Sequence, residues 1–462
     1  MKKARRILTA LLAACMLGTG TPGAVTANAV TSVTTEAQSS KPVVKATIAG
    51  EKIKLTWSAI SGAEKYRVYK YENDKLKKLT DVTKCRVILT GAKASSTYIL
   101  AVSAYVNGGW TKITKNDLVK ITFPGSSAID GEEMLSLWTS DAAAKTELIS
   151  YMKAITTEGS KDYIPIENRI AVFDLDGTLF CETDPNYFDC MLLEYRVLED
   201  PDYKDKASDF EKQVAYKIKE ENETGISHDG IEVDHGKAVA SAFKGMTLDE
   251  FNDYIQKFKK QAMPGYDGMT RGESFYRPML QIIDYLKAND FTVYIVSGTD
   301  RFIVRSLLYN SALDLPNKQI IGSDQLLAAD DQGDTDGLNY TFTDKDELIL
   351  GGEFIIKNLK MNKVTVIAQE IGEKPVLSFG NSSGDFSMNT YTITNNKYMS
   401  LAFMLCCDDT ERENGNIEKA EKMYQTCKEN NYIPISMKND WKTIYGDGVT
   451  YKGAKAGIKP AA

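Results

Sequence analysis

The stretch from Ile170 to Phe180, "IAVFDLDGTLF", decides the fold of most of this chain. Its first four residues are apolar and predict a short strand inside a sheet. Two carboxylates, Asp174 and Asp176, follow at once, although like charges repel and burial removes their hydration. A strand that ends in this way needs a ligand or a counter-charge, so we expect a polar site at its carboxyl end.

The sequence after this strand alternates between helical and strand-like segments. Residues 279–290, "MLQIIDYLKAND", and 301–312, "RFIVRSLLYNSA", predict helices. Residues 291–300, "FTVYIVSGTD", and 374–385, "KPVLSFGNSSGD", predict buried strands. Such alternation predicts an α/β fold with a doubly wound, Rossmann-like parallel sheet, whose ligand site lies at the carboxyl ends of the strands.

Polar clusters follow the predicted strands at the edge where a ligand is expected. They are Asp174 to Thr178, Ser297 to Thr299, a lysine before the last of these strands, and "GNSSGD" with Asn381 and Asp385. Carboxylates alone would repel one another, but a divalent cation together with a phosphate makes the set attractive. Oxygen ligands of this kind suit Mg²⁺, while hydroxyl, backbone N–H and ammonium groups suit phosphoryl oxygens.

These clusters, in this order, resemble the four motifs of the haloacid dehalogenase superfamily of phosphatases. The resemblance spans about residues 130–435, and we place the domain at 128–435. Residues 181–276 are rich in helix formers, as in 210–222, "FEKQVAYKIKEEN", and 247–261, "TLDEFNDYIQKFKKQ". This insert, called the cap below, is similar to that of the phosphoserine-phosphatase-like branch.

The resemblance implies a role for each matching residue. Asp174 would be the nucleophile that forms an aspartyl-phosphate, and Asp176 would be the general acid and base. The lysine would neutralise charge on the nucleophile and the phosphate. The phosphate-binding set would be Thr178, Ser297, Gly298 and the lysine. The lysine is ambiguous among Lys357, Lys360 and Lys363, and we favour Lys363 because it begins the helix that leads into the last motif strand.

The metal set implied by the resemblance is Asp174, Asp176, Asn381 and Asp385, holding Mg²⁺. Asn381 stands where many relatives have aspartate, so one ligand would be a neutral amide oxygen. This departure keeps open a second hypothesis, in which the chain is a non-catalytic cell-surface binding protein on a degenerate scaffold. The carboxylate pair favours the enzyme, a phosphomonoesterase that acts on small phosphate esters.

Residues 43–124 have a different texture, with short β-rich segments separated by turn residues. Trp57 and the segment 97–106, "TYILAVSAYV", resemble the core tryptophan and the tyrosine-bearing late strand of a fibronectin type III domain. We therefore expect an N-terminal β-sandwich, with contact to a cell surface or a polysaccharide as one possible role. Residues 436–462 are expected to be a C-terminal extension.

The first residues of the chain predict export. Lysines and arginines precede an apolar stretch from Ile7 to Leu17, and "ANA" at 27–29 suits signal-peptidase cleavage. Residues 1–29 are thus the expected signal peptide and 30–42 a flexible leader, with lipid anchoring at Cys15 as the alternative. The net charge of −7 argues against a nucleic-acid partner.

Several other features have a simpler explanation than a functional one. The only histidines, His228 and His235, are expected in a polar cap loop rather than in a metal site. The acidic run 330–337 predicts an exposed turn, because it lacks the spacing of a calcium loop. Four aromatic residues at the cap boundaries are expected in the core, although they could enclose a substrate cation; they are Tyr187, Phe188, Phe275 and Tyr276. The cysteines after residue 29 permit either disulfides or buried thiols.

Overall fold

A computed structural model describes most of the chain, which divides into two compact units, residues 1–125 and 126–462. The described residues are 41–49, 52–72, 75–91, 96–122, 131–313 and 315–453. The expected signal peptide, and the expected leader up to residue 40, lie outside them.

The first unit is an antiparallel β-sandwich. Its strands are β1 Val44–Ala49, β2 Lys52–Trp57, β3 Ala63–Glu72, β4 Lys75–Val82, β5 Arg86–Leu89, β6 Thr97–Val106, β7 Gly109–Trp110 and β8 Val119–Thr122. One sheet has the order β1-β2-β5; in the other, β4-β3-β6-β7, strand β8 also pairs with β6. Trp57 and Tyr66 meet edge to face in the core between the sheets, 5.4 Å between ring centroids. The predicted sandwich is confirmed.

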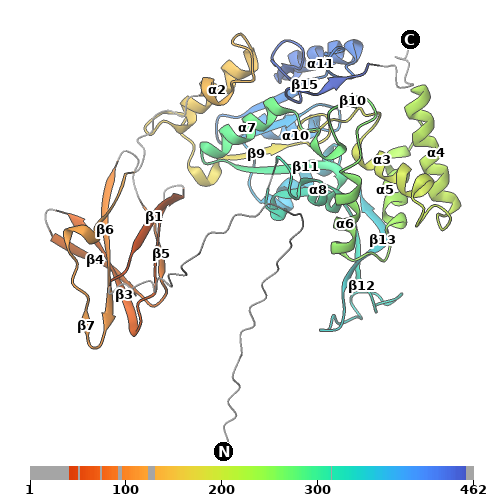
Figure 1. The fold of residues 1–462 in the computed structure, drawn as a ribbon. Coiled ribbons are helices and arrows are strands. Elements are labelled where there is room, and N and C mark those ends of the chain that lie inside the picture. The colour runs from red at the N-terminus through yellow and green to blue at the C-terminus, as the bar shows by residue number, and fades with distance from the viewer. Residues whose placement is uncertain are drawn as a thin grey trace, which may run out of the picture. The chain divides into compact units, whose positions relative to one another are not determined.

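The second unit is built on a seven-stranded sheet (Figure 1) with the order β13-β12-β11-β9-β14-β15-β16. Its strands are β9 Ile170–Phe173, β11 Thr292–Asp300, β12 Ile320–Ala329, β13 Leu348–Ile356, β14 Leu377–Gly380, β15 Leu401–Cys406 and β16 Ile433–Ser436. All neighbours pair in parallel except β12 and β13. The predicted doubly wound parallel sheet is confirmed, with an antiparallel strand added at one edge.

The strand order places a ligand site between β9 and β14. From β9 the chain adds β11 and β12 on one side and then crosses to add β14, β15 and β16 on the other. Where the order reverses, the loops after two adjacent strands part and leave a crevice. Stacked rings of Phe173, Phe379 and Phe403 fix these central strands beneath it, with centroids 4.3 and 4.7 Å apart.

Helices cover both faces of this sheet, which is why its central strands are apolar throughout. The helices are α1 Gly131–Met134, α2 Ala143–Thr156, α3 Phe188–Glu194, α4 Asp209–Thr224, α5 Ile231–Ala242, α6 Leu248–Phe258, α7 Arg277–Ala288, α8 Arg301–Leu308, α9 Met361–Val366, α10 Phe386–Ile393 and α11 Ile417–Asn430. In β9, Ala171 and Phe173 belong to the core that contains residues of α2, α7 and α8, whereas Val172 packs with residues of α9 and α10.

Helices α3 to α6 lie in the cap, and α4 and α6 match the helical segments predicted at 210–222 and 247–261. Helix α5 contains His235, which was expected in a polar loop. Capping boxes start α4 at Ser208 and α6 at Thr247, each with a glutamate three residues later. Helix α5 packs against β13, the added edge strand. The cap is therefore anchored to the outermost strand of the same sheet whose central strands carry the site at their carboxyl ends.

Residues 437–451 belong to the core of the second unit, contrary to the expected extension from residue 436. Trp441 is 1% exposed and meets Trp138 edge to face, and β17 Thr450–Tyr451 pairs with β10 Tyr266–Asp267. These residues lack helical or strand periodicity, and widely spaced aromatic side chains bury the segment instead.

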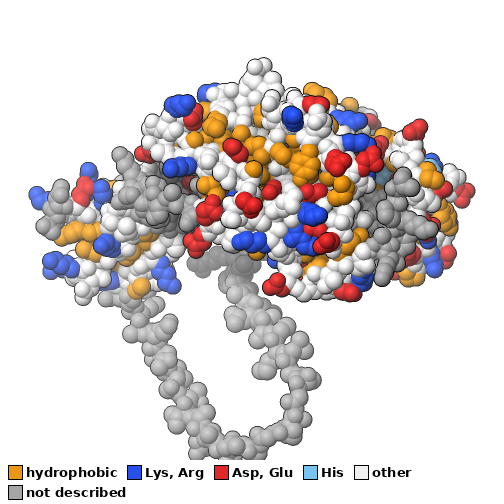
Figure 2. Space-filling view, turned by 90° about the horizontal axis from the view of Figure 1, so that it is seen from above, with side chains coloured by type: hydrophobic (Ala, Val, Ile, Leu, Met, Phe, Trp, Pro, Cys, Tyr) orange, Lys and Arg blue, Asp and Glu red, His pale blue; other side chains and the backbone are white. Residues whose placement is uncertain are grey.

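One face of the second unit carries charges of both signs (Figure 2), and the described cysteines, for which the sequence left disulfides or buried thiols open, are unpaired. On the face shown in Figure 2, acidic and basic side chains of the second unit are interspersed rather than gathered by sign. No helix of the described residues is apolar and long enough to span a bilayer. The six described cysteines are free thiols.

Candidate active site

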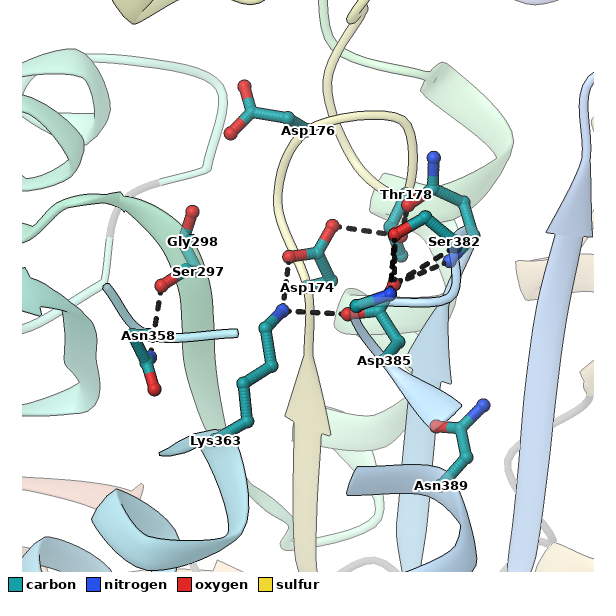
Figure 3. A network of polar contacts seen from close by, with 12 residues as sticks. Asp174, Asp176, Thr178, Ser297, Gly298, Asn358, Lys363, Ser382, Asp385 and Asn389 are labelled. Carbon is teal, nitrogen blue, oxygen red and sulfur yellow. Dashed lines mark hydrogen bonds and ion pairs between the residues drawn. The ribbon is translucent and has the colours of Figure 1, made fainter. Parts of the chain in front are cut away.

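Four of the predicted residues meet where β9 and β14 end (Figure 3). The backbone N–H of Asp174 donates to Phe379 O at 2.9 Å, so the ladder between the two strands continues to the first residue of the site. Thr178 lies in the turn after β9, Asp385 in the loop after β14, and Lys363 in α9 behind both. The parallel sheet thus brings together residues that are about two hundred positions apart in the chain.

Lys363 bridges the two carboxylates at the centre of the site. Its Nζ lies 2.6 Å from Asp174 Oδ1 and 2.7 Å from Asp385 Oδ1, and its side chain is fully buried. Burial alone would lower the pKa of Lys363, but the two carboxylates outweigh this and raise it to about 12. Of the three candidate lysines, Lys363 therefore has the position expected for the motif.

Asp385 is held by the loop that carries it. Its Oδ2 accepts hydrogen bonds from the backbone N–H groups of Asn381 and Ser382, both at 3.0 Å. Its Oδ1 faces the ammonium group of Lys363 at 2.7 Å. These contacts fix the position of the Asp385 side chain beside Asp174.

The two carboxylate oxygens of Asp174 have different surroundings. Burial raises the pKa of Asp174, and repulsion from Asp385 raises it further, while Lys363 opposes both effects. Its second oxygen, Oδ2, has only a long contact of 3.4 Å with Thr178 Oγ1. One oxygen is therefore anchored by Lys363 and the other remains available at the edge of the cavity.

The turn after β9 requires a glycine. Gly177 has φ +76°, and a Cβ atom there would lie 1.9 Å from Asn381 Nδ2. The turn is closed by Gly177 N donating to Phe180 O at 2.7 Å. The glycine thus allows both the left-handed backbone and the close approach of the loop after β14.

The structure turns the side chain of Asp176 away from the predicted metal set. Its Oδ2 accepts from Thr299 Oγ1 at 2.8 Å, on the far side of Asp174 from Asp385. Its Oδ1 is buried and has no hydrogen-bond partner among the described residues. Burial raises the pKa of Asp176 well above its usual range, followed by the charges of Asp189 and Asp174. A carboxyl group with a raised pKa is suited to donate a proton. The orientation of the side chain argues against the predicted role of Asp176 as a side-chain metal ligand.

The second motif forms the wall beside Asp176. Ser297 is fully buried, and its Oγ accepts from the Thr299 backbone N–H at 3.0 Å. Asn358 Nδ2 donates to Ser297 O at 3.0 Å and fixes the strand end, although no motif in the sequence marks this asparagine. Gly298 and Thr299 line the cavity.

Asn381 pairs with a carboxylate that the sequence did not reveal as part of the site. Its Nδ2 donates to Glu182 Oε2 at 3.0 Å, and its Oδ1 accepts from Thr178 Oγ1 at 3.3 Å. Burial raises the pKa of Glu182 to about 7, and the charges of Asp174 and Asp385 contribute, although the Asn381 hydrogen bond opposes them. Glu182 stands at the start of the cap without a motif around it, and only the turn after β9 brings it back to the site.

The residues on this side fit a hard divalent cation. Asp174 Oδ2 and Asn381 Oδ1 both face Thr178 Oγ1, at 3.4 and 3.3 Å, so neither oxygen has a short hydrogen bond from it. The carboxylates of Asp174 and Asp385 share one lysine. Oxygen donors with unneutralised negative charge are the set that Mg²⁺ prefers.

A cavity of about 310 Å³ opens onto these residues from the cap. Asp174, Asp176 and Asp385 line one side, and side chains of α3, α4 and α5 line the other. Lys357 and Lys360, the two other candidate lysines, also face it. Of the four boundary aromatics, Tyr187 lines the cavity and is 40% exposed, whereas the other three are buried as expected.

Fold and site together define a Rossmann-like α/β domain with its polar groups at the strand ends. Residues 171–388 match the family model described as haloacid dehalogenase-like hydrolase. The match extends from β9 to α10 of the second unit.

Solved structures resemble both units at low sequence identity. A conserved protein of unknown function from Anaerococcus prevotii DSM 20548 is 15% identical, with 63% of this chain and 91% of that chain covered and a TM-score of 0.40. Cytosolic 5'-nucleotidase IIIB bound to cytidine is 12% identical, with 66% and 91% covered and a TM-score of 0.40. An Fn3-like protein from Clostridium thermocellum is 23% identical, with 19% and 96% covered and a TM-score of 0.17. No curated protein matches the chain.

Proposed function

We propose that the chain is an exported, Mg²⁺-dependent phosphomonoesterase that hydrolyses small phosphate esters through an aspartyl-phosphate at Asp174. The observation that carries this proposal is the placement of Lys363 between Asp174 and Asp385, with Asp176 on the opposite side of the nucleophile. In this arrangement Lys363 neutralises negative charge on one side of the attacking Asp174 carboxylate, and Asp176 transfers the proton on the other side. The export proposal rests on the N-terminal sequence.

In the first step, an oxygen of Asp174 attacks phosphorus and the bond from phosphorus to the ester oxygen breaks. Lys363 offsets the negative charge of the nucleophile and the phosphate. Asp176 gives its proton to the departing alkoxide, so the alcohol leaves neutral. Its unpartnered Oδ1 is the atom available for this transfer, because Oδ2 is engaged by Thr299.

In the second step, Asp176 takes a proton from a water molecule that attacks phosphorus. The bond between phosphorus and the Asp174 oxygen then breaks, which releases inorganic phosphate and restores the carboxylate. Gly298, Thr299 and the loop after β14 line the cavity where phosphoryl oxygens would lie. The protein groups therefore supply both the nucleophile and the proton carrier.

Asp174, Asn381 and Asp385 would hold Mg²⁺, with Glu182 as a nearby carboxylate. When bound, the ion would neutralise charge on the phosphate. Glu182 offers the negative charge that Asn381 lacks, because its Oε2 lies 3.0 Å from the Asn381 amide. This pairing is a physical reason why the asparagine does not by itself indicate a degenerate site.

The experiment is release of inorganic phosphate from an aryl phosphate with and without Mg²⁺. We expect Mg²⁺-dependent turnover that chelation abolishes and that renewed Mg²⁺ restores. A panel of phosphorylated metabolites would then rank substrates. A folded protein that releases no phosphate from any member of the panel would favour the non-catalytic binding protein instead.

A further inference from the structure

A second group of potential metal ligands lies in the cap, opposite the strand ends. Asp189 and Cys190 are in the first turn of α3, and His235 is in α5. One ligand atom from each lies within 4.8 Å of the other two, and the described part of the chain holds no other group of three His, Cys, Asp or Glu residues that is this close. The sequence predicted no ligand role for His235, which the fold brings to two residues 45 and 46 positions earlier in the chain.

The polar atoms of this group lack the partners that buried groups usually have. The side chain of Asp189 is only 6% exposed, yet among the described residues its one polar contact is His235 Nδ1, at 3.9 Å, which is beyond hydrogen-bond distance. His235 Nε2 is buried and has no hydrogen-bond partner in the described chain. Unsatisfied buried groups cost free energy and are rare, so the buried His235 Nε2, beside a carboxylate without a close partner in the described chain, points to a missing ligand.

The chemistry of the three donors selects the class of ligand. One carboxylate oxygen, one imidazole nitrogen and one sulfur together do not suit Mg²⁺ or Ca²⁺, which take oxygen ligands. They do suit Zn²⁺, which binds all three donor types at about 2.0 to 2.3 Å and deprotonates a coordinating thiol. Donors around a tetrahedral Zn²⁺ are about 3.3 to 3.8 Å apart, so the observed limit of 4.8 Å requires only a small contraction.

The position of the group leaves a fourth coordination place open. Asp189, Cys190 and His235 line the same cavity as Asp174 and Asp176. Three protein ligands that face a cavity resemble an open zinc site, in which water or a substrate oxygen completes the tetrahedron. We propose that Asp189, Cys190 and His235 form a Zn²⁺ site in the cap side of the active-site cavity, separate from the Mg²⁺ site proposed at the strand ends.

The positive charge of Lys357, which lies beside this site, opposes cation binding, so removing it tests the proposal. Lys357 lines the cavity beside Asp189 and His235, and its ammonium group would repel a bound cation. If the group serves Zn²⁺, Lys357→Met removes that repulsion and tightens binding by at least about threefold. If the group exists only to surround Lys357, the same change leaves Zn²⁺ binding absent or unaltered.

The experiment uses Co²⁺ as a spectroscopic substitute for Zn²⁺ in the full-length, metal-free protein with excess Mg²⁺ present. A thiolate bound to Co²⁺ gives a near-ultraviolet charge-transfer band, and the proposed Mg²⁺ site contains no sulfur, so this band does not arise from Co²⁺ in that site. We expect one equivalent of Co²⁺ to produce the band and Zn²⁺ to displace it. This readout does not require turnover, so it tests the Zn²⁺ proposal independently of the phosphatase proposal.

Matched variants assign the signal to its ligands. Cys190→Ser should remove the band, and His235→Gln should weaken Co²⁺ binding at least about 100-fold, beyond the 10- to 100-fold typical of supporting residues. The controls are His228→Gln, the other histidine of the cap, and Cys407→Ser; neither should change the band. Circular dichroism checks that each variant is folded. Absence of the band in the wild-type protein, or its persistence in folded Cys190→Ser, would overturn the proposal.

Discussion

The two walls of the active-site cavity differ in how many of their polar side chains have a hydrogen bond or an ion pair within the protein. On the core wall, Asp174 and Asp385 share the buried ammonium group of Lys363, and Asp176 accepts a hydrogen bond from Thr299. On the cap wall, formed by the cavity-lining residues of α3, α4 and α5, Asp189 and His235 lie in contact without a hydrogen bond between them. Most polar groups of the core wall are therefore held by protein partners, with Asp176 Oδ1 as the exception, whereas the described chain offers Asp189 and His235 Nε2 no hydrogen bond.

The difference explains which parts of the site belong to chemistry and which to recognition. Charges that must act on every substrate gain from being fixed before binding, because no reorganisation is then needed during the reaction. Groups that contact the variable part of a substrate, or a second ion, need donor or acceptor atoms that the protein does not already engage. Variants on the two walls should therefore have different effects on activity and on stability.

The largest expected effect is on turnover and comes from the core wall. Asp174→Asn should reduce the rate of phosphate release more than about 10³-fold, because an amide is a poor nucleophile at phosphorus. The measurement is the steady-state rate with an aryl phosphate at saturating Mg²⁺. Asp334→Asn, an exposed acid of the 330–347 hairpin, is the control and should keep full activity. Comparable rates for the two variants would move the nucleophile elsewhere.

The next effect is on stability. Lys363→Met leaves Asp174 and Asp385 buried without their counter-charge and should lower the free energy of unfolding by about 3 to 5 kcal/mol. Urea denaturation of the second unit measures this. Adding Asp385→Asn to the same chain removes one of the stranded charges, so the double variant should recover part of the loss. A double variant less stable than Lys363→Met would show that the bridge is not the main electrostatic contact here.

A smaller effect concerns the cation and the Asn381–Glu182 pair. Asn381→Asp adds an anionic ligand but puts two carboxylates in contact, whereas Asn381→Asp with Glu182→Gln restores the hydrogen bond with its direction reversed. We expect Asn381→Asp alone to bind Mg²⁺ more tightly than the double variant, because the bound cation relieves the repulsion between the two carboxylates and is attracted by both of them.

The rise in melting temperature with Mg²⁺ concentration measures this affinity without turnover. Asp385→Asn in the same series should bind Mg²⁺ more weakly than wild type. Identical Mg²⁺ dependence in all of these proteins would show that the loop after β14 does not touch the cation.

The smallest effect is expected on the cap wall. Asp189→Asn, measured in metal-free protein, removes a buried charge that accepts no hydrogen bond, so the free energy of unfolding should change by less than about 1 kcal/mol and can rise. Asp385→Asn, the matched change on the core wall, should cost several times more. Equal losses would mean that the walls do not differ as the contacts indicate.

The sequence revealed the core wall better than the cap wall for a physical reason. Strand ends in a parallel sheet meet at one edge, so polar residues after apolar runs could be assembled from their order alone. Asp174 and Asp385 follow strands and are predicted in this way, whereas Lys363 is one of three candidate lysines and is favoured because it begins a helix. The direction of the Asp176 side chain is not predicted, because it depends on Thr299 in a neighbouring strand.

Residues placed by loops and helix packing had no such signal. Glu182 returns to the site through the turn after β9, and Asp189 meets His235 only because α3 packs against α5. The segment 437–451 is buried by scattered aromatics rather than by a periodic face. In each case the deciding contact joins residues that are far apart in the chain and outside a regular face. The hydrophobic periodicity of the sequence gives no information about such contacts.

The most direct test of the central claim is to find the phosphoryl group on Asp174. Asp176→Asn keeps the nucleophile but lacks the base that activates water, so an aryl phosphate, whose leaving group needs little acid assistance, should phosphorylate the enzyme faster than water releases it. Acid quenching and peptide mass spectrometry should then show a phosphoryl adduct on the peptide that contains Asp174, and none in Asp174→Asn. An adduct on another residue, or wild-type turnover without any adduct in the Asp176→Asn protein, would contradict the account.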